Sequence, residues 1–183
     1  MAVDPIFERV FKKLYGEACW GVKNTIGSAV TFEFGEPHLQ IREPIAASPQ
    51  ATRRVREHLA RRQVFVHGQW HLVIWYCDWE IFGKGKRLGS DRSRSNLERA
   101  IRSLDGQELV RFTMEARGNR CRFEFDLGGL LVTSRPHPDH DHWLLFEPSG
   151  HVLILRGDGK YSYARSNQPP DAGPWKLAVL RVK

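Results

Sequence analysis

The sequence predicts an α+β protein of antiparallel sheets in which one helix-plus-meander unit occurs twice. Two segments carry apolar residues at helical spacing, and short alternating segments separated by turn residues follow each of them. Residues 14–44 also resemble residues 104–136. The matched positions are Leu14 with Leu104 and Gly16 with Gly106, at an offset of 90, and then Phe-Glu-Phe at 32–34 with the same triplet at 123–125.

These two repeats set the expected domain organisation. The first would occupy residues 1–89 and the second residues 90–183, packed about a pseudo-twofold axis as one compact unit. A single antiparallel barrel or sandwich with two flanking helices is the alternative. The similarity extends to two further matches, Leu39 with Leu130 and Ile41 with Val132.

The first helix has signals at both ends. Asp4 can cap it, and Pro5 suits its first position, where the missing N–H of proline is not needed. Gly16 ends the run. The apolar residues between these ends fall on one side, so we expect the helix to lie on a sheet. They are Ile6, Phe7, Val10, Phe11 and Leu14.

Strands are expected after this helix, divided by turn residues. They cover residues 19–22, 29–34 and 38–42, and residues 45–62 form a polar connection with a helical turn around 55–59. Residues 64–82 are the most apolar part of the chain, with a break near Gly68 and Gln69. Because apolar residues occupy both faces from Trp70 to Cys77, we expect a central strand covered on both sides.

The second half follows the same order. Residues 83–95, which are basic and rich in glycine and serine, are expected to form a hinge between the halves. Ser95 and Glu98 form a capping box that opens a helix, and Gly106 ends it. The strands expected after this helix are 108–115, 120–126, 130–134, 143–146, 151–156, 161–164 and 175–182.

Composition favours a folded cytoplasmic protein. A hydrophobic content of 41% with six tryptophans is sufficient for a packed core, and no run of 18 apolar residues could span a membrane. Because charges occur at Asp4, Glu8 and Arg9, where a secretory signal needs an apolar run, we expect no such signal at the start. Three widely spaced cysteines are typical of reduced thiols packed as small hydrophobes. They are Cys19, Cys77 and Cys121.

The positive charge lies in the middle of the chain. Residues 51–102 hold twelve lysines and arginines against five acidic residues, and this segment carries the whole net charge of +7. Such a segment attracts an acidic protein or a nucleic acid. We expect a non-enzymatic binding or scaffold module that meets its partner here. The candidate contact residues are Arg53, Arg54, Arg56, Arg61, Arg62, Lys84, Lys86, Arg87, Arg92 and Arg94.

Nucleic-acid binding is the first alternative. The sequence pI of about 9.6 meets the electrostatic requirement for phosphate contacts. However, no RNP-like aromatic motif, zinc-finger spacing or Gly-x-x-Gly clamp occurs. The tryptophans also lie in apolar strands and not in a basic groove.

A metal-dependent hydrolase is the second alternative. Residues 137–142 are rich in imidazole and carboxylate groups, which suit Zn²⁺ or another divalent ion. The spacing matches no helical zinc motif, since prolines interrupt the segment. His67 and His71 could complete a site if the fold brings them near. The candidate ligands are His137, Asp139, His140 and His142, and apart from such an ion we expect no cofactor.

Catalytic residues are not expected. Glu33 and Glu124 occupy equivalent places in the repeats, but alternation with phenylalanines places each on the opposite face, where we interpret them as surface charges. Cys77 lies among aromatic residues, where burial raises the pKa of a thiol and makes it inert. No Gly-x-Ser-x-Gly elbow is present.

One segment carries a resemblance to a known group of proteins. Residues 104–131 contain Leu-x-Gly-Gln-x-Leu followed by Phe-x-Phe-Asp-x-Gly-x-x-Leu. This pattern resembles small bacterial α+β proteins, some of which are similar to the immunity proteins that accompany polymorphic toxins. The first half repeats it with Gly35 in place of the aspartate. The resemblance implies a non-enzymatic role, such as neutralising a partner, and it transfers no functional residue.

Overall fold

The computed structural model describes residues 2–25, 27–93, 95–115, 119–134, 136–168 and 174–180. The chain is 14% helical and 48% strand, and its ladders are antiparallel, so the predicted α+β class is confirmed. The described residues form three helices, α1 (Pro5–Leu14), α2 (Arg53–Leu59) and α3 (Leu97–Arg102). A short ladder of β1 (Ala2–Val3) with β16 (Val179–Leu180) joins the two ends of the chain.

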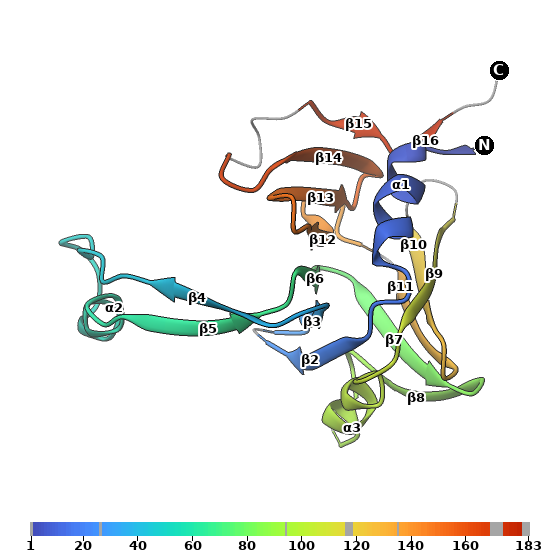
Figure 1. Ribbon diagram of the computed structural model, residues 1–183, viewed down its shortest axis with the longest axis horizontal. Helices are drawn as coiled ribbons and strands as arrows, with labels where there is room; N and C mark the ends of the chain where they lie inside the picture. Colours follow the sequence, from blue (N-terminus) through green and yellow to red (C-terminus); the bar gives the residue numbers. More distant parts are fainter. Residues whose placement is uncertain are drawn as a thin grey trace.

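Two larger sheets form the body (Figure 1). The seven-stranded sheet has the order β15 (Lys176–Leu177), β14 (Lys160–Arg165), β13 (His151–Arg156), β12 (Asp141–Phe146), β6 (Trp70–Ile74), β3 (Val30–Phe34), β2 (Cys19–Asn24). The five-stranded sheet has the order β8 (Lys86–Ser90), β7 (Asp78–Gly83), β11 (Gly129–Ser134), β10 (Arg120–Phe125), β9 (Leu109–Met114).

The two halves of the chain exchange strands between these sheets. In the first half β2, β3 and β6 are neighbours in the seven-stranded sheet, whereas β7 and β8 lie in the five-stranded sheet. In the second half β9, β10 and β11 are neighbours in the five-stranded sheet, whereas β12 to β14 lie in the other. Consequently β6 pairs with β12 and β7 pairs with β11, and each sheet contains strands of both halves.

Backbone hydrogen bonds at the ends of α1 and α3 are also reciprocal. In each pair of equivalent bonds, the two donors are 90 positions apart and so are the two acceptors. The bonds are Gly16 N to Leu109 O (3.0 Å) with Gly106 N to Cys19 O (2.7 Å), and Cys19 N to Gln107 O (2.8 Å) with Leu109 N to Glu17 O (3.2 Å). An isolated bridge between Ala18 and Glu108 lies at their centre.

A single core lies between the sheets, and α1 packs against both. Phe11 stacks on Phe112 of the five-stranded sheet at a centroid distance of 3.9 Å, and meets Trp143 of the seven-stranded sheet edge-on at 5.7 Å. Asp4 caps α1 by accepting a hydrogen bond from Ile6 N, as predicted. The predicted apolar face is confirmed, because its five residues are all buried.

The strand expected at 38–42 does not join the body. β4 (His38–Arg42) and β5 (Gln63–His67) form a separate two-stranded ribbon that carries α2 away from the body (Figure 1). In the five-stranded sheet β11 lies beside β10. The corresponding place beside β3 in the seven-stranded sheet is taken by β6 and not by β4. The sequence match between Leu39 and Leu130 therefore joins two strands, β4 and β11, that occupy different places in the fold.

The central strand expected from Trp70 to Cys77 is β6, which lies inside the seven-stranded sheet but ends at Ile74, and Trp75 beyond it is 39% exposed. In the same apolar stretch, β5 has Val64 57% exposed.

Two local expectations are corrected. In the hinge expected at residues 83–95, residues 83–90 instead belong to the β7–β8 hairpin, whose tight turn is formed by Lys84 and Gly85, both with positive φ, 49° and 77°. Positive φ at both central residues is typical of a type I′ turn, which suits the twist of a hairpin. Helix α3 begins after Asn96, whose side chain makes no capping bond, so the capping box predicted at Ser95 does not form.

The three cysteines are buried and unpaired, which confirms their prediction as packed thiols. Burial raises the pKa of Cys19 and of Cys121 to about 12, and raises that of Cys77 as well. Within the described part of the chain, none of the helices has the length and apolarity needed to cross a membrane.

Gly68 allows the close approach of the chain at the junction of β5 and β6. A Cβ there would overlap the carbonyl oxygen of Phe34 and lie 2.7 Å from its nitrogen. We predict that Gly68→Ala lowers the free energy of unfolding by about 1–3 kcal/mol, because backbone must shift to admit the methyl group. Chemical denaturation measures this. In the control Gly85→Asn, where nothing lies within 4 Å, asparagine tolerates the positive φ and a smaller loss is expected. Equal losses would contradict the steric explanation.

Candidate functional site: a projecting arm and the cluster at its root

The arm consists of β4, α2, β5 and the connections between them, residues 38–67 (Figure 1). Its five-residue strands are about 17 Å long at the usual rise of a strand. Within the described residues, β4 and β5 make extensive contacts only with each other, and every side chain of β4 is exposed. The arm is therefore supported by one ladder, although an isolated two-stranded ribbon is marginally stable in water.

One face of the ribbon is aliphatic. Partners in the ladder share a face, and the pairs Leu39–Val66 and Ile41–Val64 place four aliphatic side chains together. Their exposed fractions lie between 51% and 64%. Contiguous exposed apolar residues on a protein surface mark an interaction site. On the opposite face Arg42 lies over the ring of Phe65, 5.6 Å from its centroid.

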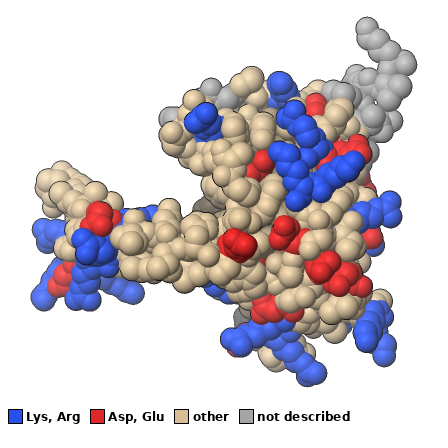
Figure 2. Space-filling view, viewed as in Figure 1, with Lys and Arg blue, Asp and Glu red and all other residues tan. Residues whose placement is uncertain are grey.

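The tip of the arm is cationic (Figure 2). Residues 42–63 contain six arginines and two glutamates. The glutamates pair with two of these arginines, Glu57 with Arg53 at 2.7 Å and Glu43 with Arg62 at 2.9 Å. Of the other four arginines, Arg42 lies over Phe65, and Arg54, Arg56 and Arg61 make no ion pair or side-chain hydrogen bond with described residues.

The other predicted contact residues lie elsewhere. Lys84, Lys86 and Arg87 belong to the β7–β8 hairpin of the body, far from α2 in Figure 1, and Arg92 follows β8. The structure therefore divides the basic segment between two surfaces. Arg94 lies outside the described residues.

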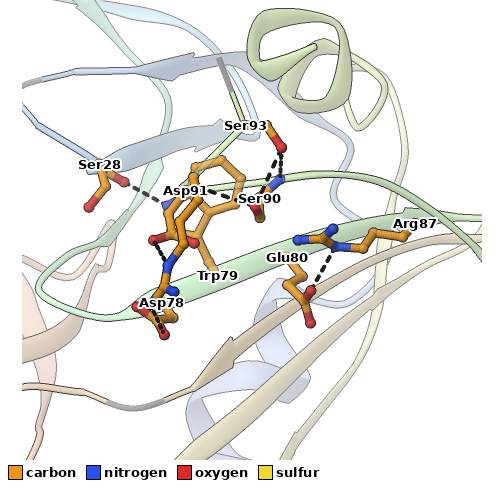
Figure 3. A network of polar contacts seen from close by, with 9 residues as sticks. Ser28, Asp78, Trp79, Glu80, Arg87, Ser90, Asp91 and Ser93 are labelled. Carbon is orange, nitrogen blue, oxygen red and sulfur yellow. Dashed lines mark hydrogen bonds and ion pairs between the residues drawn. The ribbon is translucent and has the colours of Figure 1, made fainter. Parts of the chain in front are cut away.

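Acidic neighbours neutralise the arginines of the second surface. Arg87 pairs with Glu80 at 2.7 Å, as Figure 3 shows, and Arg92 lies 3.0 Å from Asp78. The surrounding polar contacts are also internal: Trp79 Nε1 donates to Ser28 O at 2.6 Å (Figure 3). These groups hold the hairpin and the turn after it, whereas the arm tip keeps unpaired cations.

The His/Asp loop is not assembled into a metal site. His142 is fully buried, and its Nε2 lies 2.7 Å from Thr133 Oγ1 across the core. His140 stacks on Tyr76 with ring centroids 4.3 Å apart, and the His137 ring is 4.6 Å from that of His140. No three of the predicted ligands His137, Asp139, His140 and His142, all within the described residues, bring their ligand atoms within 4.8 Å of one another.

A different set of ligand-type groups does converge. Glu33 on β3, His67 at the end of β5 and His71 on β6 place one ligand atom each within 4.8 Å of the others. Glu33 and His71 are register partners, which brings the two side chains to one face. Glu33 Oε1 lies 2.9 Å from His71 Nδ1 and 3.2 Å from His67 Nδ1.

The interpretation of Glu33 as a surface charge is wrong, since the residue is only 2% exposed. Alternation along the strand correctly placed Glu33 on the face away from Phe32 and Phe34, but it cannot show whether that face is exposed to solvent. Here the root of the arm covers it. From the sequence, His67 and His71 could already be considered together, but nothing in the sequence linked Glu33 to them.

The environment of Glu33 favours its charged form. Burial raises the pKa of this carboxyl, but the contact with His71, the backbone N–H of Gly68 and the contact with His67 together outweigh burial, so that the pKa is lowered. Gly68 N donates to Oε2 at 2.9 Å. His71 Nδ1 is buried and lies 2.9 Å from Oε1 of Glu33, and it makes no well-aligned hydrogen bond with any other described residue.

Comparisons of the chain with protein-family models, with curated proteins and with solved structures find no match. The function of the arm and of the cluster is therefore inferred from their own geometry.

A pair of threonine substitutions tests the role of His142 as a core residue. Thr133→Val removes the hydroxyl bonded to His142 Nε2, and we expect it to lower the free energy of unfolding by about 1–3 kcal/mol. Thr31→Val is the control, because the Thr31 hydroxyl is buried without a hydrogen-bond partner among the described residues. Its loss should be neutral or stabilising in the same denaturation experiment. A neutral Thr133→Val would contradict the structural role.

Proposed function

We propose that this chain is a non-enzymatic binding protein whose arm captures an acidic protein partner. One observation carries the proposal: the same projecting ribbon bears an exposed aliphatic face and, at its tip, Arg54, Arg56 and Arg61, which no described acidic group neutralises. Unpaired cations and uncovered aliphatic side chains are both satisfied by a partner that supplies carboxylates beside an apolar surface.

The aliphatic face favours a protein over a nucleic acid. Nucleic acids bind through phosphate contacts made by cations along the binding surface. Four neighbouring side chains of the ribbon are instead aliphatic, and a phosphate backbone gives them nothing to pack against. A protein partner buries them, and fully burying such a side chain contributes about 1.5–3 kcal/mol before the costs of association.

The arm also offers two further modes of contact. Each strand of the ribbon has one edge without a partner strand in the described structure, so that an extended segment could add to the sheet. The guanidinium groups of the tip can bind carboxylates with two parallel hydrogen bonds. A protein that neutralises its partner, as the resemblance to immunity proteins implies, would use such a surface.

The tip arginines can be tested with acidic peptides. A random peptide library selected on the purified protein should yield sequences that combine aspartate or glutamate with aliphatic or aromatic residues. We predict that the triple variant Arg54→Gln/Arg56→Gln/Arg61→Gln binds a selected peptide at least about tenfold more weakly, since each lost charge-assisted hydrogen bond contributes about 1.5–3 kcal/mol. Fluorescence anisotropy measures the affinity.

The matched control removes the same charge from the body. In the variant Lys84→Gln/Lys86→Gln/Arg99→Gln the peptide affinity should change by less than about threefold, apart from weak long-range attraction. Equal losses in both triple variants would reduce the interaction to net charge and contradict the proposal. Tighter, steeply salt-dependent binding of a DNA or RNA oligonucleotide that requires the tip arginines would favour the nucleic-acid function instead.

The aliphatic face gives an independent test. Leu39→Ser/Val66→Ser removes two exposed side chains, so it should weaken peptide binding about tenfold or more while leaving stability nearly unchanged. Sedimentation of the unmodified protein is the second measurement. A dimer that dissociates when these two residues are changed would show that a second copy of the chain, and not an acidic partner, covers the ribbon.

We also infer that the two halves descend from one duplicated unit. The exchange of strands between the sheets and the reciprocal bonds at an offset of 90 support this. Two side-chain bonds follow the same offset: Phe112 N donates to Tyr15 Oη at 3.0 Å, and Val22 N donates to Asp105 Oδ1 at 2.9 Å. A homologous protein that contains one helix-plus-meander unit should form a dimer in which the two subunits exchange strands in the same way. A stable monomer of such a protein would contradict the inference.

A further inference from the structure

The carboxylate–histidine cluster at the root of the arm has a chemistry that the partner-binding proposal does not use. We propose that Glu33, His67 and His71 form a binding site for one divalent transition-metal ion of the zinc class. The site joins three strands, since its ligands come from β3, from the end of β5 and from β6. It does not depend on the identity of the protein partner.

The distances between the ligand atoms match a tetrahedral site. A zinc ion with bonds of about 2.0–2.1 Å to nitrogen and oxygen holds neighbouring ligand atoms about 3.3 Å apart. Glu33 Oε1 lies 3.2 Å from His67 Nδ1 and 2.9 Å from His71 Nδ1, and each of the three residues offers a ligand atom within 4.8 Å of the others. The two carboxylate–imidazole distances therefore lie within about half an ångström of the tetrahedral value.

The surroundings of His71 Nδ1 point to the same conclusion. This nitrogen is buried, lies 2.9 Å from Glu33 Oε1 and makes no well-aligned hydrogen bond with any described residue. A buried polar atom without a hydrogen bond is costly, and a metal ion bound to both atoms removes that cost. Glu33 is already oriented as ligating carboxylates are, because its second oxygen accepts a hydrogen bond from Gly68 N.

The site is accessible on one side. The His67 and His71 side chains are 30% and 22% exposed, whereas that of Glu33 is 3% exposed. Water could therefore complete the coordination of an ion held by three protein ligands, as in open zinc sites. Two imidazoles with one carboxylate suit Zn²⁺, Co²⁺ and Ni²⁺, whereas Mg²⁺ and Ca²⁺ require more oxygen ligands.

A cobalt titration tests the site on the full chain. The purified protein, freed of metal by a chelator, should bind one equivalent of Co²⁺ with the visible absorption of a tetrahedral complex, and Zn²⁺ but not Mg²⁺ should displace it. We predict that His67→Gln weakens Co²⁺ binding by about a hundredfold or more, since even the loss of a group supporting a ligand costs about 10–100-fold. Glu33→Gln and His71→Gln should have similar effects.

His67→Gln is the decisive variant because its side chain is the most exposed of the three, and circular dichroism checks that the variant stays folded. His140→Gln in the loop between β11 and β12 is the matched control and should keep the affinity of the unmodified protein. The proposal is overturned if Co²⁺ binds without defined stoichiometry, if His67→Gln binds as the unmodified protein does, or if His140→Gln abolishes binding.

Discussion

The ladder between β3 and β6 determines where the arm can leave the body. Phe34 and Trp70, at the ends of these neighbouring strands, are register partners, so the intervening residues start and finish at adjacent points of one sheet. The β3–β6 ladder therefore stays continuous although the arm leaves and returns at its end. The body keeps its own core, which strands of both halves complete by pairing β6 with β12 and β7 with β11.

The same constraint brings the cluster together. Glu33 precedes the point where the chain leaves β3, and His71 follows the point where it returns on β6. His67 ends the arm strand and reaches back over the pair. A buried carboxylate is costly unless hydrogen bonds and nearby positive charge compensate it. Gly68 and the two imidazoles provide that compensation, so the chemistry of the cluster follows from the geometry of the exit and return.

The charges of the molecule differ between body and arm. In the body, Arg87 and Arg92 are paired with acidic neighbours in the β7–β8 region, where they hold a hairpin and a turn. On the arm, tip arginines project beside an uncovered aliphatic ribbon. Charge along the sequence is continuous across both regions, but among the described residues the four-residue aliphatic face lies on the arm, beside unpaired arginines. This combination is the basis of the proposed partner surface.

The sequence by itself determined the local structure. Helical spacing with Asp4 and Pro5 predicted α1 and its buried face, and alternation between turn residues predicted most strands of the body. These features depend on contacts within a few residues, which periodicity and capping record directly. The burial of the cysteines was also predictable from their apolar neighbours.

Tertiary structure alone decided which faces are covered. Aliphatic Val64 and Val66 have the composition of a core strand but are exposed, and Glu33 has the alternation of a surface residue but is buried. Strand periodicity shows which residues share a face, but the cover over that face comes from residues far away in the sequence. The arm and the carboxylate–histidine cluster at its root therefore became visible only when the strand order was known.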